Sequence, residues 1–223
     1  VETAFAGAGD PRPLAGPGID ANVVPAEGRR KRLLIADMDS TIIGVECIDE
    51  LADFAGVKPQ VAAITEAAMR GELDFEGALD ARVALLAGLP ERALEECYVE
   101  RVRLNPGART LVRTMGELGA ETALVSGGFE FFTARVAEAA GFARNQANRL
   151  LAAEGRLTGA VARPILGRAA KLAALEALSA GLGGPAAAVA VGDGANDLDM
   201  VTAAGLGVAW RAKPALAEAA DAR

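Results

Sequence analysis

The chain has 223 residues, of which 52% are hydrophobic and 24% charged, enough for one well-filled core and a smaller accessory one. Its formal net charge of −7 argues against a surface that binds nucleic acid or an anionic membrane. The sequence has no histidine, which excludes Ser-His-Asp hydrolases, Cys-His proteases, His-ligated zinc sites and phosphohistidine chemistry. Acid–base work near neutral pH must therefore fall to carboxylates, Lys, Tyr or Cys.

Residues 1–28 are rich in Gly, Pro and Ala without periodicity, which indicates a linker or the remnant of an N-terminal region. They lack the charged-then-apolar layout of a signal peptide, and no apolar run in the chain approaches the roughly 20 residues of a membrane span. The two cysteines are widely spaced and indicate no disulfide framework. We therefore expect a cytoplasmic location and no membrane partner.

Short apolar runs predict strands that are buried on both faces. The runs are 33–36, 122–125, 187–191 and 206–209. Helical patterns separate them at 108–118, 129–140, 168–180 and 196–204. Strands that alternate with helices predict an α/β fold with a parallel sheet. Residues 148–163, with Glu154-Gly155 at their centre, predict a hairpin.

A long helical insert, roughly 45–104, interrupts this pattern after the first strand. Gly56, Gly71 and the Gly-Leu-Pro stretch at 88–90 divide it into four helices of 10–15 residues. Four short helices can form a small bundle. We interpret 45–104 as a helical cap over a sheet domain made of 29–44 and 105–223.

Polar groups follow three of the predicted strands. Asp37 and Asp39 follow the first strand, Ser126-Gly127-Gly128 follow the second, and Asp193 lies in a Gly-Asp-Gly turn after the third. Parallel strands place their carboxyl ends at one edge of the sheet, where ligands bind in open α/β folds. The three sites are therefore expected to converge.

These residue types suit phosphoryl transfer, whose transition state spreads negative charge over three oxygens. Carboxylates alone would repel the substrate, so a divalent cation must lie among them, and oxygen ligands select Mg²⁺. Asp37 and Asp193 are the natural ligands. Lys171, in the first turn of helix 168–180, can supply a second positive charge, and Ser126 with the Gly127 and Gly128 amides can donate to phosphate oxygens.

Each feature also has a plainer interpretation. An isolated Asp-x-Asp is common on surfaces, and a Gly-rich turn after a strand is often only a turn. Asp197 can be an ordinary acid in the first turn of a helix, and Lys171 a solvated helix lysine.

The predicted helix 75–87 has an arginine within its apolar stripe. Phe75, Leu79, Arg82 and Leu86 all fall on one face. An arginine there pairs, extends to solvent or binds an anion. If this face looks down on the sheet edge, Arg82 can bind a substrate carboxylate and Phe75 can exclude water.

The ordered motifs resemble those of the haloacid dehalogenase superfamily over about residues 31–214. They are Asp-x-Asp-Ser-Thr at 37–41, Ser-Gly-Gly at 126–128, Lys171 and Gly-Asp-Gly-Ala-Asn-Asp at 192–197. The segments at 46–52, 126–129 and 147–150 are similar to those of its phosphoserine-hydrolysing branch. The resemblance implies a Rossmann-like core with an inserted helical-bundle cap.

The resemblance also implies a role for each residue. Asp37 would attack phosphorus, and Asp39 would act as acid and then base. Mg²⁺ would be held by Asp37, the Asp39 carbonyl and Asp193. The other implied members are the phosphate ligands Ser126, Gly127 and Lys171, the substrate-binding Glu46 (ammonium), Arg82 (carboxylate), Phe75 and Asn196, and the supporting Thr41, Gly128 and Asp197.

Three other functions are compatible with parts of this pattern. A phosphatase or phosphotransferase of the same fold can act on another small phosphomonoester. A signalling receiver domain also phosphorylates an Asp with Mg²⁺ and a Lys, but lacks a 60-residue cap and has no use for an acid–base at position 39. A non-catalytic binding module is the third.

Overall fold

The computed structural model describes residue 16 and residues 21–223. Most of the linker predicted at 1–28 lies outside the described residues. Within the described part of the chain, no helix is long and apolar enough to cross a membrane.

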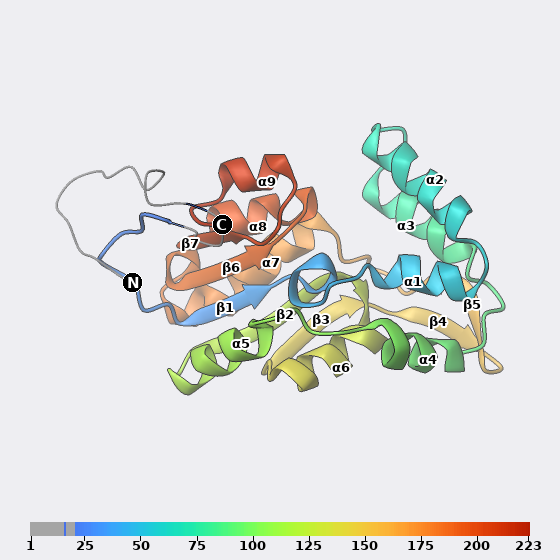
Figure 1. Ribbon diagram of the computed structural model, residues 1–223, viewed down its shortest axis with the longest axis horizontal. Helices are drawn as coiled ribbons and strands as arrows, with labels where there is room; N and C mark the ends of the chain where they lie inside the picture. The colour runs from blue at the N-terminus through green and yellow to red at the C-terminus, as the bar shows by residue number, and fades with distance from the viewer. Residues whose placement is uncertain (1–15, 17–20) are drawn as a thin grey trace.

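The core of the structure is a sheet of five parallel strands in the order β3-β2-β1-β6-β7 (Figure 1). This confirms the α/β parallel-sheet prediction and puts β1 in the centre. The strands are β1 (Leu33–Ala36), β2 (Glu121–Phe129), β3 (Arg144–Asn148), β6 (Ala188–Gly192) and β7 (Leu206–Ala209).

Helices cover both faces of this sheet because its central strands are apolar on both sides. Leu34 and Ala36 of β1 belong to one core cluster, whereas Leu33 and Ile35 belong to another on the opposite face. Figure 1 shows helices on both faces of the sheet, here called the first and the second face. They are α5 (Ala108–Glu117) and α6 (Glu130–Ala140) on the first, and α7 (Arg168–Ser179), α8 (Leu198–Ala203) and α9 (Pro214–Ala219) on the second.

The insert after β1 forms four helices at one end of the sheet (Figure 1). They are α1 (Cys47–Phe54), α2 (Lys58–Met69), α3 (Phe75–Ala84) and α4 (Arg92–Arg101). Gly56, Gly71 and Gly88 all have positive φ, as expected for glycines that end helices.

Helices α2, α3 and α4 have 12, 10 and 10 residues, within the predicted range of 10–15, whereas α1 has only eight. The helix expected at 75–87 ends at Ala84, because the amides of Leu86 and Ala87 bond to carbonyls three residues earlier and tighten the last turn. Similarly, the segment 196–204 begins as a 3₁₀ turn, Ala195–Asp197, before α8.

The predicted hairpin is present as β4 (Leu150–Ala153) and β5 (Arg156–Val161), with positive φ at both turn residues. It packs against the helical insert. The Gly88 amide donates to the Leu157 carbonyl, and the Leu157 amide donates to the Leu89 carbonyl. A segment from the second half of the chain therefore forms one side of the cap region.

Two features of the sheet differ from the prediction. Strand β2 continues to Phe129 through a register shift after Val125, so that Ser126–Gly128 belong to the strand rather than following it. Strand β3 was not predicted, because Arg-Asn-Gln-Ala-Asn is polar and mostly exposed at the sheet edge and has no apolar alternation.

Candidate active site

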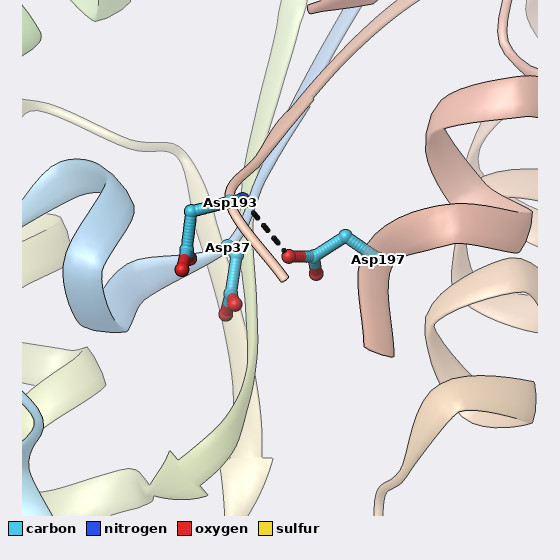
Figure 2. A group of neighbouring side chains, drawn as sticks. All are labelled: Asp37, Asp193 and Asp197. Carbon is cyan, nitrogen blue, oxygen red and sulfur yellow. Dashed lines mark hydrogen bonds between the residues drawn. The ribbon is translucent and has the colours of Figure 1, made fainter. Parts of the chain in front are cut away.

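The three strand ends meet, as predicted, at the carboxyl edge of the sheet. The Thr41 hydroxyl donates to Asp193 Oδ1 at 2.9 Å, which joins the segment after β1 to the end of β6. Figure 2 shows Asp37 and Asp193 side by side, with Asp197 facing them from the start of the next helix. The sites predicted from separate parts of the sequence therefore form one cluster.

Asp37 is buried directly after β1 and is held in a fixed orientation. Its Oδ1 accepts a hydrogen bond from the Met38 amide at 2.7 Å, and its Oδ2 lies 2.8 Å from Lys171 Nζ. Burial raises the pKa of Asp37, and the Lys171 ammonium opposes that shift. The geometry leaves a carboxylate oxygen beside a fixed positive charge at a strand end.

Asp197 is the second partner of Lys171 and is completely buried. Its Oδ1 lies 2.6 Å from Lys171 Nζ, and its Oδ2 accepts from the amides of Asp193 and Gly194, each at 3.1 Å. Burial lowers the pKa of Lys171, but Asp37 and Asp197 reverse this and raise it above its usual value. Lys171 is therefore an ammonium held between two carboxylates, not a solvated lysine.

Asp39 lies in a different environment from Asp37. Its Oδ1 accepts from the Cys47 amide at 3.0 Å, and the Ser126 hydroxyl lies 3.4 Å from its Oδ2. Burial, with help from the nearby Glu46 charge, raises the pKa of Asp39 to about 7. A carboxyl group with this pKa can both donate and accept a proton near neutral pH.

Two glycines let the strand ends approach these carboxylates. A Cβ on Gly128 would lie 2.5 Å from Asp39 Oδ2, and one on Gly192 would lie 2.5 Å from the Asp197 side chain. Any side chain at either position would push the carboxylates out of place.

The cluster also has the donors that a divalent cation needs. Carboxylate oxygens of Asp37, Asp193 and Asp197 all lie within 4.8 Å of one another. Burial raises the pKa of Asp193 to about 6, and the hydrogen bond from Thr41 opposes the shift. Because Asp197 already accepts bonds from Lys171 and two amides, Asp37 and Asp193 are the members best able to face a cation. The Asn196 amide is 3.5 Å from Asp37 Oδ2.

Ser126 is buried at the bulged part of β2 and adjoins Asp39. Its hydroxyl oxygen accepts from the Gly128 amide at 2.8 Å. This bond tightens the bulge that Ser126–Gly128 form within β2 beside Asp39, which we call the Ser-Gly-Gly loop or serine loop. The Ser126 hydroxyl therefore lies beside Asp39, in the region where the sequence predicts a phosphate.

The residues predicted in the cap are less tightly fixed. Glu46 is exposed and accepts from the Ser40 hydroxyl at 2.5 Å. Arg82 is half-buried on α3, and its Nε donates to the Ala78 carbonyl at 3.1 Å. Burial lowers the pKa of Arg82, and the charges of Asp49 and Glu46 oppose this. Among the described residues, no carboxylate forms an ion pair with Arg82.

Phe75 is the predicted cap residue that reaches the sheet edge. Cβ atoms added to Gly127 and Gly167 would lie 3.1 and 2.9 Å from its ring atoms. The ring therefore packs against the Ser-Gly-Gly loop and against the residue that precedes α7. The ring therefore lies at the sheet edge, and its exclusion of water from a substrate stays a prediction.

Sequence reasoning assigned no role to two groups that hold the site together. The Cys47 amide fixes Asp39, which could not be foreseen because a main-chain donor leaves no residue-type signal. The Asn148 side chain bonds to the Gly127 carbonyl. Asn148 lies in the segment 147–150, which resembles the family, but nothing in the sequence indicated a chemical role for its side chain.

The family model of haloacid dehalogenase-like hydrolases matches residues 34–202. A phosphoserine phosphatase of Streptomyces coelicolor is 51% identical over 206 residues, which cover 91% of this chain and 50% of that protein. A phosphoserine phosphatase of Polaromonas sp. is 46% identical over 212 residues, covering 92% and 90%. The chain spans about half the length of the first curated relatives, 50% and 47% of the first two.

Solved structures give the same relationship. A substrate-bound phosphoserine phosphatase complex superposes with a TM-score of 0.78 at 41% identity, covering 86% of this chain and 91% of the other. A phosphoserine phosphatase with an analogue of a phospho-aspartyl intermediate matches with the same score, identity and coverage.

Removing the buried ammonium should destabilise the fold. We expect Lys171→Met to lower the free energy of unfolding by about 3–5 kcal/mol, because Asp37 and Asp197 lose the charge that compensates their burial. Urea denaturation at neutral pH measures the change. Lys58→Met, at an exposed lysine of α2, is the control and should change stability by less than about 0.5 kcal/mol. Equal stability of the two variants would contradict the structural role of Lys171.

Proposed function

Because the chain belongs to the haloacid dehalogenase-like hydrolases, we propose that it releases phosphate from O-phospho-L-serine through an aspartyl-phosphate on Asp37. One observation supports this reaction most directly. Two buried carboxyl groups at the end of β1 have separate surroundings, Asp37 beside Lys171 and Asp39 with a pKa of about 7. The named activity of the relatives supports the choice of substrate.

In this proposal the two carboxyl groups divide the chemistry. An Asp37 oxygen attacks phosphorus, and the bond from phosphorus to the serine oxygen breaks while Asp39 gives that oxygen its proton. Water then attacks the aspartyl-phosphate, Asp39 takes a proton from it, and the bond from Asp37 to phosphorus breaks. Such a sequence requires one carboxylate placed to attack beside a fixed positive charge and a second carboxyl group that can give and take a proton.

The phosphate group would be held from two sides. Lys171 lies beside Asp37 and can neutralise charge on the transferring group. The Ser126 hydroxyl lies next to Asp39, and this hydroxyl and the Gly127 amide can donate to phosphate oxygens, with Gly128 allowing the close approach to Asp39.

We propose Mg²⁺ as the cation, because the available donors are all oxygens. Asp37, Asp193 and the Asp39 carbonyl would hold it, and when bound it would neutralise charge on the phosphoryl oxygens. Asp197 and Thr41 keep Asp193 in place, and Asn196 reaches Asp37.

Selection of the substrate would belong to the cap. We take 45–104 as the cap and 29–44 with 105–223 as the catalytic core. Glu46 and Arg82 carry the opposite charges that a zwitterionic amino acid needs, and the charge of Glu46, after that of Asp49, acts to raise the pKa of Arg82. Phe75, packed against Gly127, would keep water from the reacting group.

A panel of phosphomonoesters tests the function. With Mg²⁺ present, we expect phosphate release from O-phospho-L-serine to exceed that from phosphothreonine, phosphotyrosine and sugar phosphates in kcat/KM. Chelation with EDTA should abolish release, and added Mg²⁺ should restore it. Equal rates across the panel would reject phosphoserine as the substrate and leave the hydrolase chemistry, whereas undiminished release in EDTA would reject the cation.

Asp37→Asn tests the nucleophile. An amide oxygen cannot attack phosphorus effectively, so we expect turnover to fall by a factor of about 10⁴ or more and no phosphorylated protein to form. Rapid acid quench with labelled substrate measures both. Asp53→Asn, at an exposed acid of α1, should behave like the unchanged protein. Full activity of Asp37→Asn would exclude the mechanism.

Analogues of the substrate test the two cap charges separately. Phosphoethanolamine keeps the ammonium but lacks the carboxylate, and 3-phosphoglycerate replaces the ammonium with a hydroxyl. We expect Arg82→Met to lower kcat/KM for phosphoserine about 10- to 100-fold, the effect of losing a charged hydrogen bond, with little effect on phosphoethanolamine. In the same way, Glu46→Gln should lower kcat/KM for phosphoserine and have little effect on kcat/KM for 3-phosphoglycerate, which has no ammonium.

Arg92→Met, at an exposed cap arginine, is the control for the cap variants. If Arg82→Met slowed all substrates equally, Arg82 would not be the carboxylate ligand.

A further inference from the structure

Asn148 is a buried amide at the end of β3 that takes no part in the chemistry described above. Its Nδ2 donates to the Gly127 carbonyl at 2.8 Å and to the Leu166 carbonyl at 3.1 Å. Its Oδ1 accepts from the Leu166 amide at 2.7 Å. All three bonds go to main-chain atoms, so the side chain joins two loops.

Each of these loops leads to a group that would hold phosphate. Gly127 follows Ser126 in the bulged part of β2. Leu166 precedes Gly167, the N-cap of α7, and Lys171 lies in the first turn of that helix. The Asn148 amide therefore sets the separation between the serine loop and the helix that carries the ammonium.

The cap meets the same two loops. The Phe75 ring packs against both Gly127 and Gly167. A change in the distance between the loops would therefore displace both the proposed phosphate ligands and the Phe75 ring that packs against the loops.

We propose that Asn148 is a positioning residue that holds Ser126 and Lys171 in register on one phosphate group. The catalytic part of this inference rests on the proposed function, but its phosphate-binding part does not. Without the two N–H donors, the buried carbonyls of Gly127 and Leu166 lose their partner, and the loops must move to satisfy them. A misplacement of about 1 Å at a reacting group can cost about 100-fold in rate.

Asn148→Asp is the sharpest test, because it keeps the shape and the acceptor for the Leu166 amide and removes both donors. Asn148→Ala is the second variant and carries the test if the aspartate variant does not fold. The matched controls are Asn145→Asp and Asn145→Ala. Asn145 lies on the same strand and is exposed, and its side chain accepts from the Thr133 hydroxyl, away from both loops.

Two ligands separate positioning from general damage. We expect the Asn148 variants to weaken inhibition by orthovanadate and calorimetric binding of inorganic phosphate about tenfold or more, with a similar fall in kcat. Their affinity for Mg²⁺, titrated without phosphate, should stay within about twofold, because Asp37 and Asp193 follow β1 and β6 and do not contact Asn148. The Asn145 variants should match the unchanged protein in every measurement.

The outcomes are distinguishable. Unchanged phosphate and orthovanadate binding in the Asn148 variants would overturn the inference, and so would an equal loss of Mg²⁺ affinity, which indicates general disruption. If the unchanged protein binds phosphate but does not hydrolyse phosphoserine, the proposed substrate fails, and the calorimetric comparison still decides the role of Asn148.

Discussion

The site depends on one buried ammonium. Lys171 is fully enclosed, and it is tolerated only because Asp37 and Asp197 lie within 2.8 Å of it. These three residues come from a strand end, a helix and a turn that are far apart in sequence. Their charges compensate one another only when β1, β6 and α7 pack as observed, so the arrangement that places Asp37 also fixes the core. The requirement that these buried charges balance therefore also sets the positions of the three side chains.

This constraint explains why polar residues gather at one edge of an apolar sheet. Asp197 bonds through one oxygen to Lys171 and through the other to the amides of Asp193 and Gly194, so a single carboxylate orients both the turn that carries Asp193 and the ammonium. Asn148 does the same for two further loops with a neutral amide. Lys171, Asp197 and Asn148 are thus each satisfied by main-chain atoms or by an opposite charge, as burial demands.

The sequence predicted the parts of this arrangement that leave a residue-type signal. Apolar runs located β1 and β6, and the acids that follow them marked the carboxyl edge of a parallel sheet. Strand β3 was missed because an exposed edge strand needs no apolar alternation. The Cys47 amide that holds Asp39 was invisible for another reason, since every residue carries such a donor. Pairwise contacts between distant segments, such as Lys171 with Asp197, follow from packing and not from local pattern.

The groups around Asp37 are held more firmly than the charged groups of the cap. Under the proposed function, this difference separates the phosphoryl chemistry from the selection of the substrate. The groups around Asp37 are buried and mutually bonded, so a change in any of them disturbs the others. Glu46 is exposed and Arg82 half-buried without an ion-pair partner among the described residues, so either can change at little cost to the core. Phe75 joins the halves by packing on Gly127. Under the proposed function, substitutions in the cap would therefore alter which phosphomonoester is accepted, while the carboxylates and the ammonium would keep the same reaction.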